Sequence, residues 1–290
     1  MKQKSVISLL VVLIALAAAV ATLTGILSTE GPGPYQHESI RGETVTIYGR
    51  GVYQHMSAEV APQGIAQDYV TLLLGIPLLL LALLWARSGS LKGRLLLAGI
   101  LGYFLVTYLF YLLMGMYNAL FLVYVFLLGT TFFSFLLTLF SLDRKQLPSA
   151  FLASTPNRLT GGFLIFVTVS IALLWLGIVV PPLLEGTVVP VQVEHYTTLV
   201  VQGLDLGLLL PSGFVTGMLF IRKRTWGYLF APVYFVFLSL LMTALTAKVV
   251  AIALLDYNVI PVIFIIPTFN LLTVLSSVFL FRNIREVAQV

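Results

Sequence analysis

The chain has 290 residues, of which 59% are hydrophobic and 9% charged. Soluble domains carry about 25% charged residues, so this composition, with a mean hydropathy of +1.04, excludes an ordinary water-soluble protein. The net charge is +5, but the basic residues stand in short clusters between apolar runs. That pattern is typical of membrane topology signals and not of a nucleic-acid-binding face. The chain has no cysteine, which excludes disulfides and thiolate catalysis.

Eight apolar runs are long enough to cross a bilayer, because a spanning helix needs about 20 residues. The third and fourth runs are separated only by Tyr117 and Asn118, but together they are too long for one crossing. The predicted fold is therefore an all-α integral membrane protein. Its spans are expected at residues 6–27, 69–86, 95–116, 119–141, 162–184, 199–221, 227–255 and 259–281.

The charges support this count and orient the chain. With the N-terminus inside, all but three of the 16 basic residues fall in cytoplasmic segments (16 − 3 = 13). The exceptions are Arg41 and Arg50 in an outer loop and Lys248 inside a span. The positive-inside rule therefore predicts that both termini are cytoplasmic. An alternative for the first span is a signal peptide, since it starts basic and contains Ala19-Val20-Ala21.

The two halves of four spans follow the same order of features. Each second span has an acid near its outer end, Asp68 or Asp205, and each third span ends in a tight turn containing Asn118 or Asn258. The acid and the asparagine are 50 residues apart in one half (118 − 68) and 53 in the other (258 − 205). This predicts a 4+4 parallel repeat about an axis along the membrane normal. Chance regularity among short loops is the competing explanation.

Residues 28–67 form the one sizeable segment outside the predicted spans. Residues 44–48 alternate like a strand, and Gly49-Arg50-Gly51 is expected to turn the chain back through Val52-Tyr53. Residues 57–67 are expected to lead as a helix into the second span. The segment is too short for an independent domain, so it is predicted to be an extracytoplasmic loop with a short β-hairpin.

Several segments carry a family resemblance: IYGRGVY (47–53), AQD (66–68), GIPLL (75–79), residues 175–182, EHYTTLVVQGLDLGLLLP (194–211) and WGY (226–228). With them, most of the chain resembles a family of bacterial eight-span membrane proteins that has no assigned activity. The resemblance implies a plasma (inner) membrane location. It implies no functional residues.

Charged residues inside spans are costly and are therefore candidates for function. Asp205 and Lys248 lie at roughly 9 and 12 Å from the outer ends of the sixth and seventh spans, given 1.5 Å per residue. We predict an ion pair between them. Two alternatives are that Lys248 extends its ammonium to the headgroups, and that the pair only fixes helix packing.

Prolines give a second pointer, because paired interruptions in matching spans mark midplane binding sites in repeat transporters. Pro77 and Pro211 interrupt the second and sixth spans, although a simple kink is the common outcome. Gly203 with Gly207, and Gly213 with Gly217, have the spacing that allows close helix packing on the sixth span. Asp205 lies on roughly the opposite face from Gly203 and Gly207, so protein contact is predicted on both faces. The full set of predicted site residues is Asp205, Lys248, Asp68, Gln67, Gln202, Pro77 and Pro211.

Metal and enzyme signals are weak. His55, Glu59 and His195 lie in outer loops and are the only candidates for a metal, but nothing in the sequence predicts that they converge. No metal and no cofactor is predicted. No P-loop, nucleophile elbow or zinc-protease motif is present, so no enzyme is predicted. The tyrosines of the third and fourth spans are attributed to interface anchoring and core packing.

Two functions follow as hypotheses. The first is a small-solute transporter or permease-like protein with a site between the second and sixth spans. The second is a non-transporting scaffold or assembly partner that docks another protein through its outer loop. The predicted partners are thus the lipid bilayer and either a small solute or a protein, with no nucleic acid.

Overall fold

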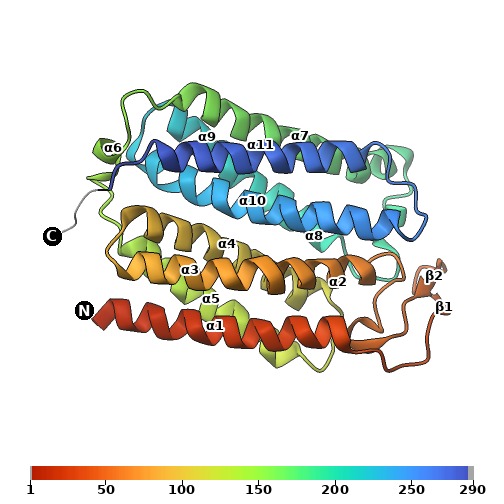
Figure 1. Ribbon diagram of the computed structural model, residues 1–290. Coiled ribbons are helices and arrows are strands. Elements are labelled where there is room, and N and C mark those ends of the chain that lie inside the picture. The colour runs from red at the N-terminus through yellow and green to blue at the C-terminus, as the bar shows by residue number, and fades with distance from the viewer. Residues whose placement is uncertain (1, 287–290) are drawn as a thin grey trace.

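The computed structural model describes residues 2–286, and within that range eight helices are long and apolar enough to cross a membrane. This confirms the predicted fold class (Figure 1). The second span begins at Ala61 and not at residue 69, because the predicted lead-in helix runs into it without a break. The spans are α1 (Lys2–Leu27), α2–η2–α3 (Ala61–Val70, Thr71–Gly75, Ile76–Arg87), α4 (Leu91–Met114), α5 (Phe121–Phe140), α7 (Asn157–Glu185), α8–η4–α9 (Val200–Leu204, Asp205–Leu209, Leu210–Ile221), α10 (Thr225–Ala253) and α11 (Val262–Arg282).

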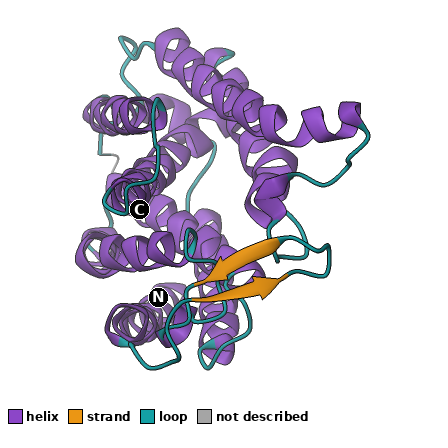
Figure 2. Cartoon of the chain, turned by 90° about the vertical axis from the view of Figure 1, so that its right-hand side faces the viewer, coloured by secondary structure: helices purple, strands orange, loops and turns teal. Residues whose placement is uncertain are grey.

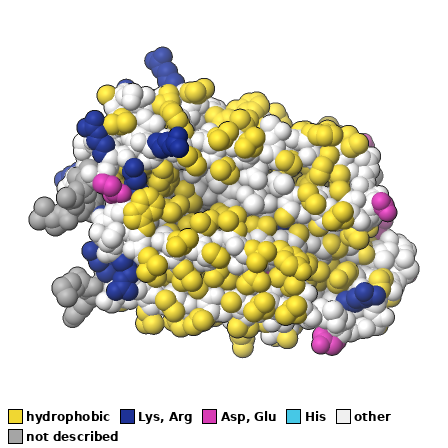
Figure 3. Space-filling model, in the orientation of Figure 1, with side chains coloured by type: hydrophobic (Ala, Val, Ile, Leu, Met, Phe, Trp, Pro, Cys, Tyr) yellow, Lys and Arg dark blue, Asp and Glu magenta, His cyan; other side chains and the backbone are white. Residues whose placement is uncertain are grey.

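Helices α1 to α5 form one group and α7 to α11 the other, and the start of α1 and the end of α11 lie at the end of the bundle opposite the β-strands (Figure 1). Within the first group each span packs against the next, and α5 returns to α1. The second group follows the same order, except that α11 barely contacts α7. The first half is thus a closed four-helix group and the second is open along one side. Apolar side chains cover the length of the helices in Figure 3, as expected for surfaces facing lipid.

A two-stranded hairpin lies across one end of the bundle (Figure 2). Strand β1 (Tyr35–Glu38) pairs antiparallel with β2 (Thr44–Ile47), with Tyr35 opposite Ile47. The predicted strand at residues 44–48 is therefore confirmed as β2, but its predicted partner, Val52-Tyr53, is wrong. Residues Gly51–Tyr53 form a short 3-10 helix, η1. Gly49, at φ 71°, lies directly against the backbone of Gly33. The chain returns along β2 only after η1, where Ile47 forms an antiparallel bridge with Ser57 and the Tyr48 amide donates to the Met56 carbonyl.

The two halves repeat the same backbone features in register. η2 and η4 are both π-helical turns of five residues, and each is followed by a proline as the second residue of the next helix. Pro77 and Pro211 are 134 residues apart (211 − 77). The same separation relates both ends of η2 and η4, both ends of α3 and α9, and the starts of α4 and α10.

Glycines show that this register extends to packing. A Cβ on Gly93 would meet the backbone of Trp85 and Ala86, and a Cβ on Gly227 would meet Leu219 and Phe220, in each case 134 residues later. Gly93 and Gly227 let the third span of each half fold tightly back on the second. The halves therefore share one geometry, as expected for the predicted parallel repeat.

The third spans, α4 and α10, pack against each other at the centre of the molecule. A Cβ on Gly99 of α4 would meet the side chain of Val236 and the carbonyl of Val233 on α10. Val233 is the equivalent of Gly99 (233 − 99 = 134). Equivalent residues of a two-fold repeat meet only near the axis, so the pseudo-two-fold axis passes between α4 and α10 at this contact.

Short elements complete the structure. A four-residue helix, α6 (Leu147–Ala150), follows α5, and a 3-10 turn, η3 (Val191–Val193), precedes the sixth span. The C-terminal segment crosses back to the first half, where Glu286 accepts hydrogen bonds from the Ser90 hydroxyl and the Leu91 amide at the start of α4. These contacts fix the ends of the two halves to each other.

Candidate functional site

The first half encloses Asp68, whose side chain is 1% exposed. The hydroxyl of Tyr53, from η1 in the outer loop, donates to Oδ2 at 2.5 Å, and the hydroxyl of Tyr111 lies 2.9 Å from Oδ1. Helix α1 covers the carboxyl with Gly25, because any Cβ there would overlap Oδ2. A buried carboxyl needs such partners, since an unpaired one is costly in an apolar interior.

Gln67 extends this polar cluster toward the centre of the bundle. Its side-chain amide donates to Tyr103 at 2.8 Å and to Thr107 at 3.2 Å, and the Tyr103 hydroxyl pairs with Thr71 at 2.8 Å. Thr71 is the first residue of the π-helical turn η2. The side chains named here all make hydrogen bonds, whereas the buried hydroxyls of Tyr108, Thr131 and Ser134 in the same half have no partner. The predicted site residues Gln67 and Asp68 are both buried.

The second half presents its charges differently. Asp205 is half-buried, and the indole Nε1 of Trp175 donates to its Oδ2 at 2.8 Å. Lys248 on α10 is also half-buried. Within residues 2–286, Lys248 has no hydrogen bond and no carboxylate within 4.0 Å, so the predicted direct ion pair with Asp205 is not formed. The side chain of Gln202, one turn outward, likewise makes no hydrogen bond among the described residues.

The second and sixth spans share no substantial contact, because α10 lies between them and packs against α2 on one side and α9 on the other. Lys248 therefore stands between the two predicted carboxylates. The charges of both Asp205 and Asp68 act on it. A site directly between the second and sixth spans, as predicted, is therefore not formed. The seventh span lies between them, and Lys248 is on that span.

Each of the two predicted site prolines, Pro77 and Pro211, is the second residue after a π-helical turn. A proline frees the carbonyl four residues earlier, and a wider π turn moves that carbonyl away from the proline ring. A different carbonyl, that of Leu209, lies two residues before Pro211 and accepts from the Tyr234 hydroxyl at 2.7 Å and from the Ser212 hydroxyl at 2.8 Å. Beside Pro211, an apolar cavity of about 190 Å³ opens between α7 and the sixth span.

The structure confirms close packing at one of the two predicted glycine pairs. Gly217 packs against the carbonyl of Gly161 on α7, and Gly213 packs against Thr168 and Tyr234. Gly203 and Gly207 face open space, so the close packing predicted at this pair is wrong.

The outer loop is docked on the second half. The guanidinium of Arg41 donates to the carbonyls of Glu194 and Tyr196 at 2.6 and 2.7 Å. The amide of Ser57 donates to the Tyr196 hydroxyl at 3.1 Å. Burial, with an added contribution from Glu194, raises the pKa of Tyr196 to about 12, against the lowering effect of Ser57. The loop thus connects the two halves at the end opposite the termini.

The metal candidates lie in this docked region. The His195 ring contacts the backbone carbonyl of His55 at 2.9 Å and not its ring. Desolvation and, secondarily, the charge of Glu194 raise the pKa of Glu59. Among the described residues, no group of three or more His, Asp or Glu side chains is arranged to hold a metal.

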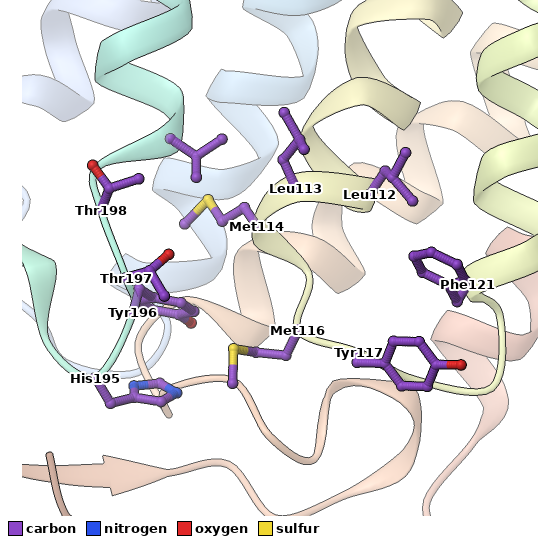
Figure 4. A pocket seen from close by; sticks show the side chains of 11 residues that line it. Leu112, Leu113, Met114, Met116, Tyr117, Phe121, His195, Tyr196, Thr197 and Thr198 are labelled. Atoms are coloured by element: carbon purple, nitrogen blue, oxygen red, sulfur yellow. The ribbon is translucent and has the colours of Figure 1, made fainter. Parts of the chain in front are cut away.

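A cavity of about 230 Å³ also lies at this end, between the end of α4 and residues 195–200 (Figure 4). Met114, Met116 and His195 surround it, with the hydroxyl-bearing Thr197 and Thr198 on one side. It contains neither Asp205 nor Lys248, so it is separate from the charged site.

Sequence reasoning missed two kinds of site residue. Tyr53, Tyr103 and Tyr111 were attributed to a strand, to packing and to interface anchoring, but their hydroxyls bind Asp68 and Gln67. Trp175 is the hydrogen-bond partner of Asp205. A rule that every acid within a span needs a donor would have prompted a search for such residues, but the sequence does not say which one reaches it.

Comparison with known proteins finds no match: no family model, no curated protein and no solved structure is similar to this chain. The resemblance to a bacterial membrane-protein family therefore stays a prediction. The class that the fold defines is a multi-pass membrane protein with eight spans.

Proposed function

We propose that this chain is a small-solute transporter or permease-like protein of the plasma membrane, with both termini in the cytoplasm and its solute site in the open second half. Support for the orientation comes from the Lys and Arg side chains, which gather at the end that holds the termini (Figure 3). Support for the site comes from Asp205, Lys248 and Gln202, which are half-buried polar side chains on the sixth and seventh spans of the second half.

The observation that carries the proposal is that Lys248 has no hydrogen-bond or carboxylate partner among the described residues. An ammonium within a membrane span that has no bonded partner is costly, so a ligand that completes its bonds binds favourably. Asp205 accepts one hydrogen bond, from Trp175, and retains further acceptor sites. A zwitterionic solute satisfies both: its carboxylate binds Lys248 and its ammonium binds Asp205.

The absence of cysteine allows a direct test. The full chain is reconstituted in liposomes as Lys248→Cys, and uptake of a panel of radiolabelled zwitterionic amino acids is measured. We expect uptake by the wild type and loss in Lys248→Cys. Aminoethyl methanethiosulfonate, which restores a cation, should recover uptake, whereas a neutral methyl reagent should not.

Gly129→Cys is the matched control, because Gly129 on α5 faces open space in the first half. It should retain uptake with and without reagent. Uptake that is absent from the wild type for every solute, or that is unchanged in Lys248→Cys, contradicts the proposal.

The scaffold hypothesis has one supporting feature. Arg41, His55 and Ser57 of the outer loop contact the second half. Ile40 at the hairpin turn, by contrast, is 94% exposed. A docked partner would cover it. Stoichiometric co-purification of a protein that is lost in Ile40→Asp and retained in Ile40→Leu would favour this function over transport.

A further inference from the structure

The hydrogens around Asp68 do not match an ionised carboxylate. The Tyr111 hydroxyl lies within hydrogen-bond distance of two acceptors, the Gly64 carbonyl at 3.0 Å and Asp68 Oδ1 at 2.9 Å. Tyr53 donates to Oδ2. Three contacts therefore share two hydroxyl hydrogens if Asp68 is ionised, because a hydroxyl has one hydrogen.

A proton on Asp68 completes the count. The acid then donates from Oδ1 to the Tyr111 oxygen, Tyr111 donates to Gly64, and Tyr53 donates to the remaining carbonyl oxygen. Each contact has its own hydrogen, and no charge is left in the interior of the first half. Lys248 is the one cation whose charge acts on Asp68, and it makes no contact with the carboxyl.

We propose that Asp68 is a proton-binding site, occupied in this structure, whose deprotonation draws Lys248 toward the first half. The step is balanced: the O–H bond of Asp68 breaks, the proton leaves to water at the hairpin end, and the Tyr111 hydroxyl turns from Gly64 to Oδ1. The carboxylate that remains competes with Asp205 for the single cation between them. Proton loss in the first half thereby changes the charge available in the second.

The surroundings of Asp68 contain no other ready proton acceptor. Helix α1 presents Gly25, which cannot titrate. Tyrosines and Lys248 are the titratable groups that act on Asp68, and phenols do not ionise near neutral pH. These groups are Tyr53 from the outer loop, Tyr103, Tyr108 and Tyr111 from α4, Tyr124 from α5 and Lys248 from α10.

The consequence for transport rests on the proposed function. If a solute binds Asp205 and Lys248, proton release from Asp68 weakens its site by removing the cation, and solute binding favours the protonated form of Asp68 in return, because such coupling is reciprocal. Asp68 is then the coupling site of a proton-linked carrier. The proton site itself does not depend on any solute.

Infrared spectroscopy tests the proton directly. The chain has four aspartates, Asp68, Asp143, Asp205 and Asp256, so carboxyl-isotope labelling of aspartate gives few signals. The labelled full chain is placed in lipid nanodiscs and titrated with base. We expect a protonated aspartic acid band at neutral pH that Asp68→Asn abolishes and the matched control Asp205→Asn retains.

Two further variants keep the test decisive if Asp68→Asn does not fold. Tyr53→Phe should shift the band to higher frequency, because the carbonyl oxygen loses its donor. Lys248→Met should move its loss to higher pH, because a nearby cation favours the carboxylate. A wild-type spectrum without a protonated aspartate, or a band that neither Asp68→Asn nor Tyr53→Phe alters, overturns the proposal.

Failure of the proton site and failure of the transport function are distinguishable. A wild type that takes up amino acids but lacks the band refutes the proton site and leaves the carrier. A wild type that shows the titrating band but takes up no amino acid retains the proton site and refutes the carrier.

Discussion

The two halves of the molecule share a backbone but differ in what they enclose. In the first, α1, α2, α4 and α5 close around Asp68, and aromatic hydroxyls bond its carboxyl. In the second, α7 and α11 barely touch, and Asp205 and Lys248 are half-buried beside an opening. One geometry thus supports a closed polar core in the first half and a pair of less buried charges in the second. The side chains and the position of the fourth span decide between them.

The acids themselves are not equivalent, although their sequence order suggested it. The register that relates the halves pairs Asp68 with Gln202 (202 − 68 = 134) and Asp205 with Thr71 (205 − 71 = 134). Asp205 is therefore at the start of its π-helical turn, whereas Asp68 lies about one helical turn further out. All four of these residues are polar, but in each equivalent pair only the aspartate is charged.

The largest expected difference between the halves is at glycines. Gly25→Ala places a methyl group against the Asp68 carboxyl and the Tyr53 hydroxyl, and should cost about 1–3 kcal/mol of unfolding free energy. Gly203→Ala, its matched control, enters open space and should raise stability by about 0.5 kcal/mol through helix propensity. Thermal unfolding in nanodiscs measures both. Equal losses would show that the second half is closed.

Removing one hydrogen-bond donor to the aspartate in each half should give a smaller difference in unfolding free energy between the halves. Tyr53→Phe leaves a buried carboxyl oxygen of Asp68 without its donor and should cost about 1–3 kcal/mol. Trp175→Phe removes the donor to the half-buried Asp205 and should cost under about 1 kcal/mol, because solvent or headgroups can replace it. The same unfolding measurement applies, and a larger loss for Trp175→Phe would contradict the difference in closure.

The contact that joins the halves at the hairpin should have a local effect. Arg41→Ala removes the donors to Glu194 and Tyr196 and should cost about 1 kcal/mol, seen as faster hydrogen exchange in residues 35–47. Arg50→Ala is the control, since Arg50 is exposed and makes no side-chain hydrogen bond within the described residues. Unchanged exchange in Arg41→Ala would mean that the loop docks by other contacts.

The smallest effect is a pH dependence at the same junction. The folded protein raises the pKa of Glu59, chiefly by desolvation and then through Glu194, so it binds that proton more tightly than the unfolded chain does. Stability from this group is present in acid and falls as pH rises through the raised pKa. Glu59→Gln should therefore stabilise by less than about 1 kcal/mol at neutral pH and not at all in acid. The exposed Glu43→Gln is the control, measured by unfolding over pH.

The sequence by itself determined the spans and the repeat. Apolar runs of membrane length and clustered basic residues predict eight helices, since lipid demands both length and internal hydrogen bonding. Pro77 and Pro211 mark matching positions for the same reason in each half: a proline disrupts the same backbone bond wherever it occurs. Such signals are local along the chain, and they can be read without knowing which helices pack against one another.

Tertiary structure alone decided which polar groups meet. Tyr53 reaches Asp68 from an extramembrane loop, and Lys248 stands between two carboxylates because α10 packs between the second and sixth spans. The sequence gives the depth of a residue in the membrane but not its rotation or its neighbours, which depend on packing between helices. For that reason the similar depth of Asp205 and Lys248 was predicted, but the ion pair between them was predicted wrongly. The sequence also did not predict that the first half is closed and the second half open.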